Sequence, residues 1–246
     1  MRWIVMSLML LAGGCAVPPT PPTPVEPTHE RDPVTGRGFW MYVPSTYRAE
    51  RPSPLIVTCH GTPPYDVANH HIREWQWYGE KNNCIVIAPE LIATDGIFGD
   101  GPTAGMLNDE RFILSMVSYL GYHYNIDRAN VMITGFSGGG FPTYFIGLRH
   151  PDLFTCIVAR NCNFSRSNIE GWWTSEALRT PILIYYGEFD PNVIQSQSGD
   201  AIAYLRAHQF SVETQIVPKT GHERRPDIAM KFFFNNWKPP RPSLQR

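Results

Sequence analysis

The sequence predicts an α/β fold in which helices cover both faces of a mostly parallel central sheet. Between residues 36 and 237, short apolar runs alternate with longer amphipathic segments, which is typical of a strand–helix–strand succession. The apolar runs are nearly continuous rather than alternating, as expected for strands that are covered on both faces. In sheets of this kind, the chemically active residues lie on loops beyond the carboxyl ends of the strands.

The first half of this region contains four expected strands and two expected helices. Asn108 or Asp109 would cap the second helix, because short polar side chains accept hydrogen bonds from the free N–H groups of a first turn. A glycine-rich loop precedes that helix. The strands are expected at 38–44, 54–61, 84–90 and 130–136, and the helices at 69–82 and 108–125.

The second half continues the alternation. After the fourth strand a helix is expected up to His150, with Pro142 in its first turn, where a missing N–H does no harm. A polar insertion at 162–180 contains Trp172 and Trp173, which we expect to pack against the domain; alternatively, one ring faces a substrate group. Further strands are expected at 154–161, 181–190 and 212–218, and further helices at 198–209 and 226–237.

The N-terminus differs in composition from the rest of the chain. Arg2 is followed by an apolar stretch and then by small residues, which indicates a secretory signal too short to span a bilayer. The stretch ends in LAGGC, which resembles a bacterial lipobox, in which the cysteine is lipidated and becomes the first mature residue. We therefore expect residues 1–15 to be a signal peptide and Cys15 to carry lipid. The alternative is an ordinary signal peptide that ends near Ala16.

A proline-rich segment follows this cysteine. Seven of the seventeen residues at 17–33 are proline, so we expect an extended tether over 16–36. The folded domain would then span 37–238, followed by a short tail at 239–246. This organisation predicts an exported bacterial lipoprotein that is bound to a membrane through its lipid anchor and faces the periplasm or the cell surface; the alternative is a soluble secreted protein.

Charge and cysteine usage narrow the function classes. The 21 Lys and Arg against 22 Asp and Glu are scattered without a basic run, so nucleic acid is not an expected partner. The histidines lack HExxH or paired-ligand spacing and no CxxC pair occurs, so we expect no metal and no other cofactor. The sequence does not indicate an oligomeric state. Buried free thiols are expected, with one disulfide left open, at Cys59, Cys84, Cys156 and Cys162.

The stretch VMITGFSGGG, residues 131–140, places Ser137 between glycines where a buried strand is expected to end. Gly-x-Ser-x-Gly between a strand and a helix is typical of a nucleophile elbow. The serine there occupies a strained position on a tight turn, and Gly135 and Gly139 carry no side chain that would clash. The alternative is a glycine-rich turn that merely lets strand and helix pack closely. We expect Ser137 to be a nucleophile.

His222 and Asp190 are the expected partners of this serine. A serine hydroxyl needs a base, and the base needs an orienting carboxylate. His222 follows the last expected strand and Asp190 ends a buried one, which gives the order serine, acid, histidine. Glu188 is the rival acid, nearer the sheet body, and we favour Asp190. His60 is expected to be structural. The remaining histidines of the domain are expected on helix surfaces or helix ends: His70, His71, His123, His150 and His208.

Two backbone N–H groups are expected to stabilise the negative charge of a tetrahedral intermediate. Gly138 would supply one of them from the turn after the nucleophile. The other is expected in the loop after the strand at 54–61, where Pro63 and Pro64 have no N–H. Thr62 is the best candidate there and Gly61 the second.

Together these motifs resemble those of the α/β-hydrolase family, in particular secreted esterases of the polyhydroxybutyrate-depolymerase and feruloyl-esterase type. The resemblance covers nearly all of 37–237 and lies in YVPSTY, PLIVTCHGT, NVMITGFSGGG, YYGEFDP and TGHE. It implies hydrolysis of small or polymeric carboxylic esters through an acyl-enzyme on Ser137. A serine peptidase or other acyl hydrolase of the same fold, and a catalytically silent binding lipoprotein, are the alternatives. Only thirty-one residues separate Asp190 from His222, which indicates a small lid and an open pocket.

Overall fold

An eight-stranded sheet forms the centre of the computed structural model, which describes residues 25–95 and 102–241. The strand order is β1-β2-β4-β3-β5-β6-β7-β8. The pairs from β4 to β8 are parallel, whereas β1 and β2 add an antiparallel edge. The strands are β1 (Thr28–Arg31), β2 (Gly38–Tyr42), β3 (Ser53–Cys59), β4 (Ile85–Pro89), β5 (Ile126–Ser137), β6 (Cys156–Cys162), β7 (Ile182–Gly187) and β8 (Val212–Val217).

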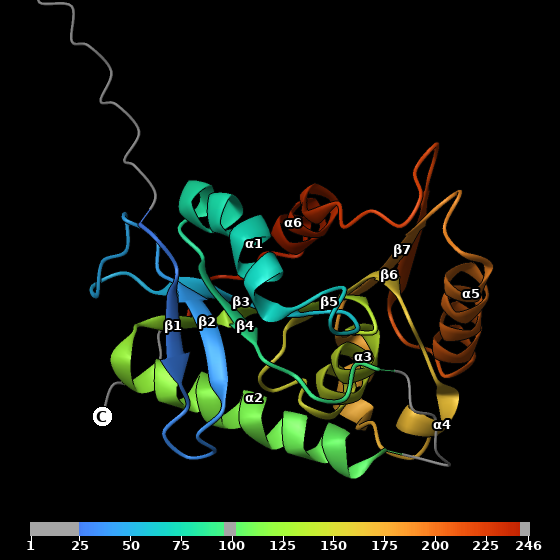
Figure 1. Ribbon diagram of the computed structural model, residues 1–246, viewed down its shortest axis with the longest axis horizontal. Helices are drawn as coiled ribbons and strands as arrows, with labels where there is room; N and C mark the ends of the chain where they lie inside the picture. Colours follow the sequence, from blue (N-terminus) through green and yellow to red (C-terminus); the bar gives the residue numbers. More distant parts are fainter. Residues whose placement is uncertain (1–24, 96–101, 242–246) are drawn as a thin grey trace, which may run out of the picture.

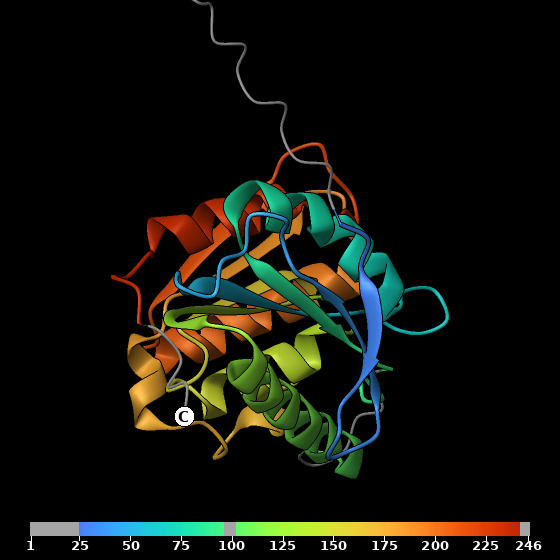
Figure 2. The same cartoon turned by 90° about the vertical axis from the view of Figure 1, so that its left-hand side faces the viewer.

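Helices cover both faces of the sheet, which confirms the predicted fold class (Figure 1). On one face lie α1 (Ala68–Asn82) and α6 (Pro226–Asn235); on the other lie α2 (Ala104–His123), α3 (Gly140–Arg149) and α5 (Asn192–Ala207). Figure 2 shows the sheet between α1 with α6 and α2. The short α4 (Arg166–Ile169) and a 3₁₀ turn (Ser175–Arg179) lie in the expected insertion.

The two faces explain why the strands read as unbroken apolar runs. In β3, Leu55 and Val57 pack into the core beneath α2 and α3, while Ile56 packs beneath α1 and α6. Successive side chains of a strand point to opposite faces, so a strand covered twice needs apolar residues at nearly every position. The expected packing of the tryptophans is confirmed for Trp173, whereas Trp172 is 41% exposed.

The start of α2 differs from the sequence prediction. The helix begins at Ala104, and the Thr103 hydroxyl accepts a hydrogen bond from the Met106 N–H at 3.2 Å. The prediction of a cap at Asn108 or Asp109 is therefore wrong. Asp109 is instead buried on the inner side of α2, where its carboxylate accepts the N–H groups of Ile92 and Ala93. It thereby holds the loop that follows β4.

The sheet begins earlier in the chain than expected. Residues 28–31, which the sequence assigned to the tether, contain no proline and pair with β2 as β1. At the other end, the N–H of Arg241 donates to Asp127 at 2.7 Å, so the expected tail is docked at its start. The signal peptide, Cys15 and the tether up to residue 24 lie outside the described residues. Among the helices that the structure describes, none is long and apolar enough to cross a membrane.

Candidate active site

Ser137 lies at the carboxyl end of β5, in the middle of the sheet. Its φ is 53°, a left-handed conformation that non-glycine residues seldom adopt. A Cβ on Gly135 would lie 2.3 Å from Thr143 Oγ1, and one on Gly139 would lie 2.3 Å from the Cys59 carbonyl oxygen. Both positions therefore require glycine. The local geometry is that of a nucleophile elbow, with α3 starting three residues later.

Asp190 is the carboxylate that contacts His222. The Nδ1 of His222 lies 2.6 Å from Oδ1 of Asp190, whose side chain is buried. Glu188 is exposed and accepts the N–H of Lys219 at 2.8 Å. Of the two acids, Asp190 is therefore the one placed to orient His222.

Two further donors hold the Asp190 carboxylate. The N–H of Gly187 donates to its Oδ2 at 2.6 Å, and the Asn161 side-chain amide donates to the same oxygen. With Oδ2 occupied in this way, Oδ1 is left to accept the proton on Nδ1 of His222. Asn161 stands at the end of β6 with φ 52°, a conformation that asparagine tolerates well. In the sequence, Asn161 is the last residue of the strand expected at 154–161, and this position at a strand end was the signal that could have identified it.

Ser137 and His222 line one pocket of about 480 Å³. The His222 ring lies 4.5 Å from the Phe136 ring, centroid to centroid, and Tyr65 at the rim is 87% exposed. Within the described part of the chain, no hydrogen bond joins Ser137 to His222. Such bonds are often long without substrate and tighten when it binds. The pocket is open, as the short segment between Asp190 and His222 indicated.

The expected N–H donors lie beside the serine. A Cβ on Gly138 would lie 2.0 Å from the Thr94 carbonyl oxygen, so this turn is packed directly against the loop after β4. The Thr62 hydroxyl donates to that same oxygen at 2.7 Å. The N–H of Gly61 donates to Asp66 at 2.7 Å and is therefore not free. Among the described residues, none accepts a hydrogen bond from the Thr62 N–H, which leaves Thr62 as the candidate donor in this loop.

Two buried histidines lie near this site but have structural partners. His60 accepts the Leu91 N–H on Nε2 at 2.9 Å and donates from Nδ1 to the Gly61 carbonyl, the structural role expected of it. Burial lowers the pKa of His60, which favours this neutral form. The expectation that His71 lies on a helix surface is wrong, because it belongs to the inner face of α1 and is fully buried.

The four cysteines of the domain, expected as buried thiols, are all buried and free. Burial raises the pKa of each thiol, so they remain protonated and unreactive at neutral pH. In the described ranges, no group of three or more His, Cys, Asp or Glu side chains is arranged to hold a metal ion.

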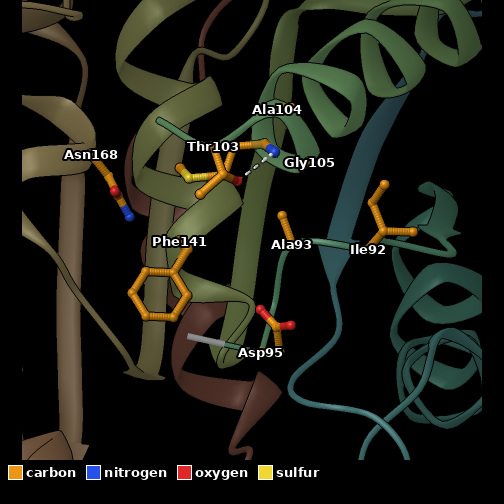
Figure 3. Close-up of a pocket in the computed structure, with 9 residues that line it drawn as sticks. Ile92, Ala93, Asp95, Thr103, Ala104, Gly105, Phe141 and Asn168 are labelled. Atoms are coloured by element: carbon orange, nitrogen blue, oxygen red, sulfur yellow. Dashed lines mark hydrogen bonds between the residues drawn. The ribbon is translucent and has the colours of Figure 1, made fainter. Parts of the chain in front are cut away.

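A second pocket, of about 280 Å³, flanks Thr94 on the side of α2 and α3. Figure 3 shows Phe141 and Asn168 on one side of it, facing Ala93 and Ile92 across the space. Ser137 and His222 do not line this pocket. The pocket that contains the serine and the histidine is therefore the candidate active site.

Sequence comparison agrees with this geometry. The profile of the phospholipase/carboxylesterase family, a group of α/β-hydrolases, matches residues 103–233, which is more than half of the chain and includes Ser137, Asp190 and His222. The chain belongs to this family. Its expected likeness to esterases within the α/β-hydrolases is thereby confirmed.

Individual relatives include esterases and peptidases. The chain is 26% identical to a bifunctional acetylxylan esterase/xylanase of Neocallimastix patriciarum over 80% of its own length and 28% of that protein. It is 24% identical to dipeptidyl-peptidase 5 of Porphyromonas endodontalis over 74% of its own length and 32% of that protein. The chain thus spans about a third or less of the curated relatives it matches.

Solved structures share the fold. A ferulic acid esterase of Anaeromyces mucronatus, determined in complex with ferulic acid, superposes with a TM-score of 0.62 at 19% identity. The superposition covers 86% of this chain and 90% of the esterase. At this identity the likeness establishes the architecture of the domain.

Proposed function

We propose that the protein is a serine esterase that hydrolyses carboxylic esters through an acyl-enzyme on Ser137. The observation that supports it most directly is that His222, which contacts the buried Asp190, lines one pocket together with Ser137. Family membership supports the same reaction class.

In this mechanism each residue has one task. His222 takes the proton of the Ser137 hydroxyl on Nε2 while Oγ bonds to the ester carbonyl carbon. Asp190 accepts from Nδ1, which fixes the tautomer and stabilises the imidazolium. The carbonyl oxygen becomes an oxyanion, which the N–H groups of Gly138 and Thr62 stabilise.

Collapse of this intermediate breaks the bond to the alcohol, which leaves with the proton from His222. Water then repeats the sequence on the acyl-enzyme: His222 removes a proton from the water, and its oxygen bonds to the acyl carbon. The carboxylic acid is released, and the proton returns to Ser137.

The lining of the pocket favours an ester whose alcohol is polar, such as a sugar. Besides Ser137 and His222 it is lined by one hydroxyl side chain, four charged side chains and two aromatic rings, of which the one at the rim is exposed: Thr62, Asp66, Glu74, Glu223, Arg224, Phe136 and Tyr65. Relatives named for acetylxylan and ferulic acid support esters of sugars with acetyl or aromatic acyl groups. A screen of acetylated and feruloylated sugars beside simple alkyl esters tests this choice.

The first test is replacement of the nucleophile. We expect wild-type protein to hydrolyse p-nitrophenyl acetate and butyrate, and Ser137→Ala to lose this activity while its circular dichroism and unfolding curve stay unchanged. The variant removes one hydroxyl and keeps the pocket. A folded Ser137→Ala protein with more than a few per cent of wild-type turnover would contradict the nucleophile assignment. Inactivity of the wild type on every ester would favour the silent binding protein instead.

A peptidase is the second candidate, because two of the matched relatives are dipeptidyl peptidases. The same acyl-enzyme chemistry cleaves amides when the pocket holds a peptide. Aminoacyl and dipeptidyl p-nitroanilides distinguish the two: faster turnover of these than of any ester would favour the peptidase.

We further propose that lipid on Cys15 anchors the exported protein to a bacterial membrane. The apolar stretch before Cys15 and the prolines after it support this. Cells that make the wild type should keep it in the membrane fraction and release it with detergent, whereas Cys15→Ser should appear in the soluble fraction. Equal solubility of both forms would exclude the anchor.

A further inference from the structure

Asp66 is a buried carboxylate that no step of the proposed reaction uses. It lies in the loop between β3 and α1, with 5% of its surface exposed. Its Oδ2 accepts the N–H of Gly61 and the Nε2–H of His71, each at 2.7 Å, and its Oδ1 accepts from the guanidinium of Arg224. Donors from the β3 loop, from α1 and from the loop after β8 therefore converge on one side chain.

Through Arg224, Asp66 is connected to the histidine. Arg224 follows His222 by two residues, and its guanidinium lies 5.2 Å from the centroid of the Phe136 ring. The imidazole of His222 also lies beside that ring, at 4.5 Å between the two centroids. Phe136 directly precedes Ser137 in the chain. The contacts from Arg224 to Phe136 and from Phe136 to His222 therefore lie next to the nucleophile.

Through Gly61, Asp66 is connected to the expected oxyanion donor. The bond to the Gly61 N–H fixes the peptide between His60 and Gly61, one residue before the Thr62 N–H. A Cβ on Gly61 would lie 3.2 Å from Cβ of Ser137, so this peptide is packed against the serine. A shift of Asp66 would therefore move Thr62 relative to the nucleophile.

The surroundings keep Asp66 ionised and in place. Burial alone would raise the pKa of Asp66, but the hydrogen bonds from His71 and Gly61 and the charge of Arg224 hold it below its ordinary value. The backbone of Arg224 is held separately, because its carbonyl oxygen accepts from the Tyr185 hydroxyl at 2.8 Å. Asp66 therefore determines where the Arg224 side chain lies rather than where the loop runs.

We propose that Asp66 is a positioning residue that holds the Thr62 donor and the His222 ring in register on the two sides of Ser137. The inference rests on the proposed esterase reaction. Asp66 lines the pocket, but among the described contacts none joins it to Ser137 or His222: it acts on them through Gly61 on one side and through Arg224 and Phe136 on the other. Asp66 therefore affects the stability of the transition state, in which the oxyanion and the imidazolium form together, more than the binding of substrate.

The test compares Asp66→Asn, Arg224→Gln and the double variant with Asp227→Asn. Asp227 pairs at 2.8 Å with Arg225, the residue after Arg224. Asp227→Asn therefore controls for the loss of a carboxylate that pairs with an arginine in the loop after β8. We expect Asp66→Asn to lower kcat by about ten- to a hundredfold, the scale of a small misplacement, with KM nearly unchanged. The double variant should lose no more than the worse single variant, because both break one link. Asp227→Asn should keep the wild-type kcat.

A second measurement does not depend on turnover. In a Ser137→Ala background, the low-field proton resonance of the His222–Asp190 hydrogen bond should shift or broaden with Asp66→Asn and with Arg224→Gln, but not with Asp227→Asn. A folded Asp66→Asn protein with unchanged kcat and resonance would overturn the inference, as would multiplying losses in the double variant. Should Asp66→Asn fail to fold, Arg224→Gln decides by the same two readouts. An inactive wild type with a resonance that responds would refute only the proposed esterase.

Discussion

The two acidic residues near His222 provide a direct comparison at the scale of single residues. Asp190→Asn keeps the shape of the side chain but removes the charge that stabilises the imidazolium, and it permits the wrong imidazole tautomer. We expect kcat/KM on an activated ester to fall by about three to four orders of magnitude, the scale seen for this change in serine triads. Glu188→Gln is the matched control, because among the described contacts the Glu188 carboxylate accepts only the N–H of the exposed Lys219.

Steady-state kinetics of both variants on one ester checks this prediction. The reverse result, with Glu188→Gln crippled and Asp190→Asn near normal, would show that the acid had been assigned to the wrong residue. Asn161 and Gly187 provide an internal check. Both donate to Asp190, so the asparagine introduced at position 190 would retain an acceptor toward them, and misfolding is not expected to explain the loss.

The strand-to-helix turn is the feature to test at the scale of one element. Gly139→Ala would place a methyl group 2.3 Å from the Cys59 carbonyl, a contact that backbone movement alone can relieve. We expect a loss of about 1–3 kcal/mol in the free energy of unfolding and a strong loss of activity, because the turn carries Ser137 and Gly138. Gly199→Ala, in α5 with open space around the position, should instead stabilise by about 0.5–1 kcal/mol.

Urea unfolding of the two glycine variants, measured beside ester turnover, separates packing from helix propensity. A Gly139→Ala protein with wild-type stability and activity would mean that the turn can relax, contrary to its packing against β3.

Helix α1 makes the stability of the domain sensitive to acid. Burial lowers the pKa of His71 from its ordinary 6.5 to about 4, so the unfolded chain binds a proton between these values that the folded protein excludes. The free energy of unfolding should therefore decline as the pH falls from about 6.5 to 4, and this decline should be smaller in His71→Gln. The pKa of Asp66 is also lowered in the folded protein, so its protonation should further reduce the free energy of unfolding below about pH 4.

His70→Gln is the control, since the neighbouring His70 is half exposed. Chemical denaturation at several pH values checks the slope. A wild-type stability that is flat between pH 6.5 and 4 would contradict the buried, neutral state of His71.

At the scale of the whole molecule, the sequence predicted what depends on local pattern. Continuous apolar runs identified the parallel strands β3 to β7, because burial on both faces leaves no polar alternation. Strand β8, whose side chains are mostly exposed, lacks such a run. Ser137, Asp190 and His222 were chosen from their places after strands, and the fold brings them to one edge of the sheet. Thr62 was chosen as the second oxyanion donor because the prolines that follow it have no N–H. The alternative, the N–H of Gly61, is already bound to Asp66 in the structure.

What the sequence did not reveal depends on contacts between distant segments. Asp66 and Arg224 are far apart in the chain, and neither sits in a motif, so nothing local indicated their pairing. His71 was taken for a surface residue because a helix with many polar residues hides which face is buried. Strand β1 was missed because four polar residues after a proline-rich stretch carry no strand pattern, and an edge strand needs little apolar surface.

Strand β1 also sets a length scale for the proposed anchor. Because the sheet begins at Thr28, only twelve residues lie between it and Cys15, and a fully extended chain over this distance spans at most ~45 Å. A lipid on Cys15 would therefore keep the domain within a short distance of the bilayer surface. Small esters would diffuse to it freely, whereas a polymer in the cell envelope would have to bring its ester groups within that distance to be cut.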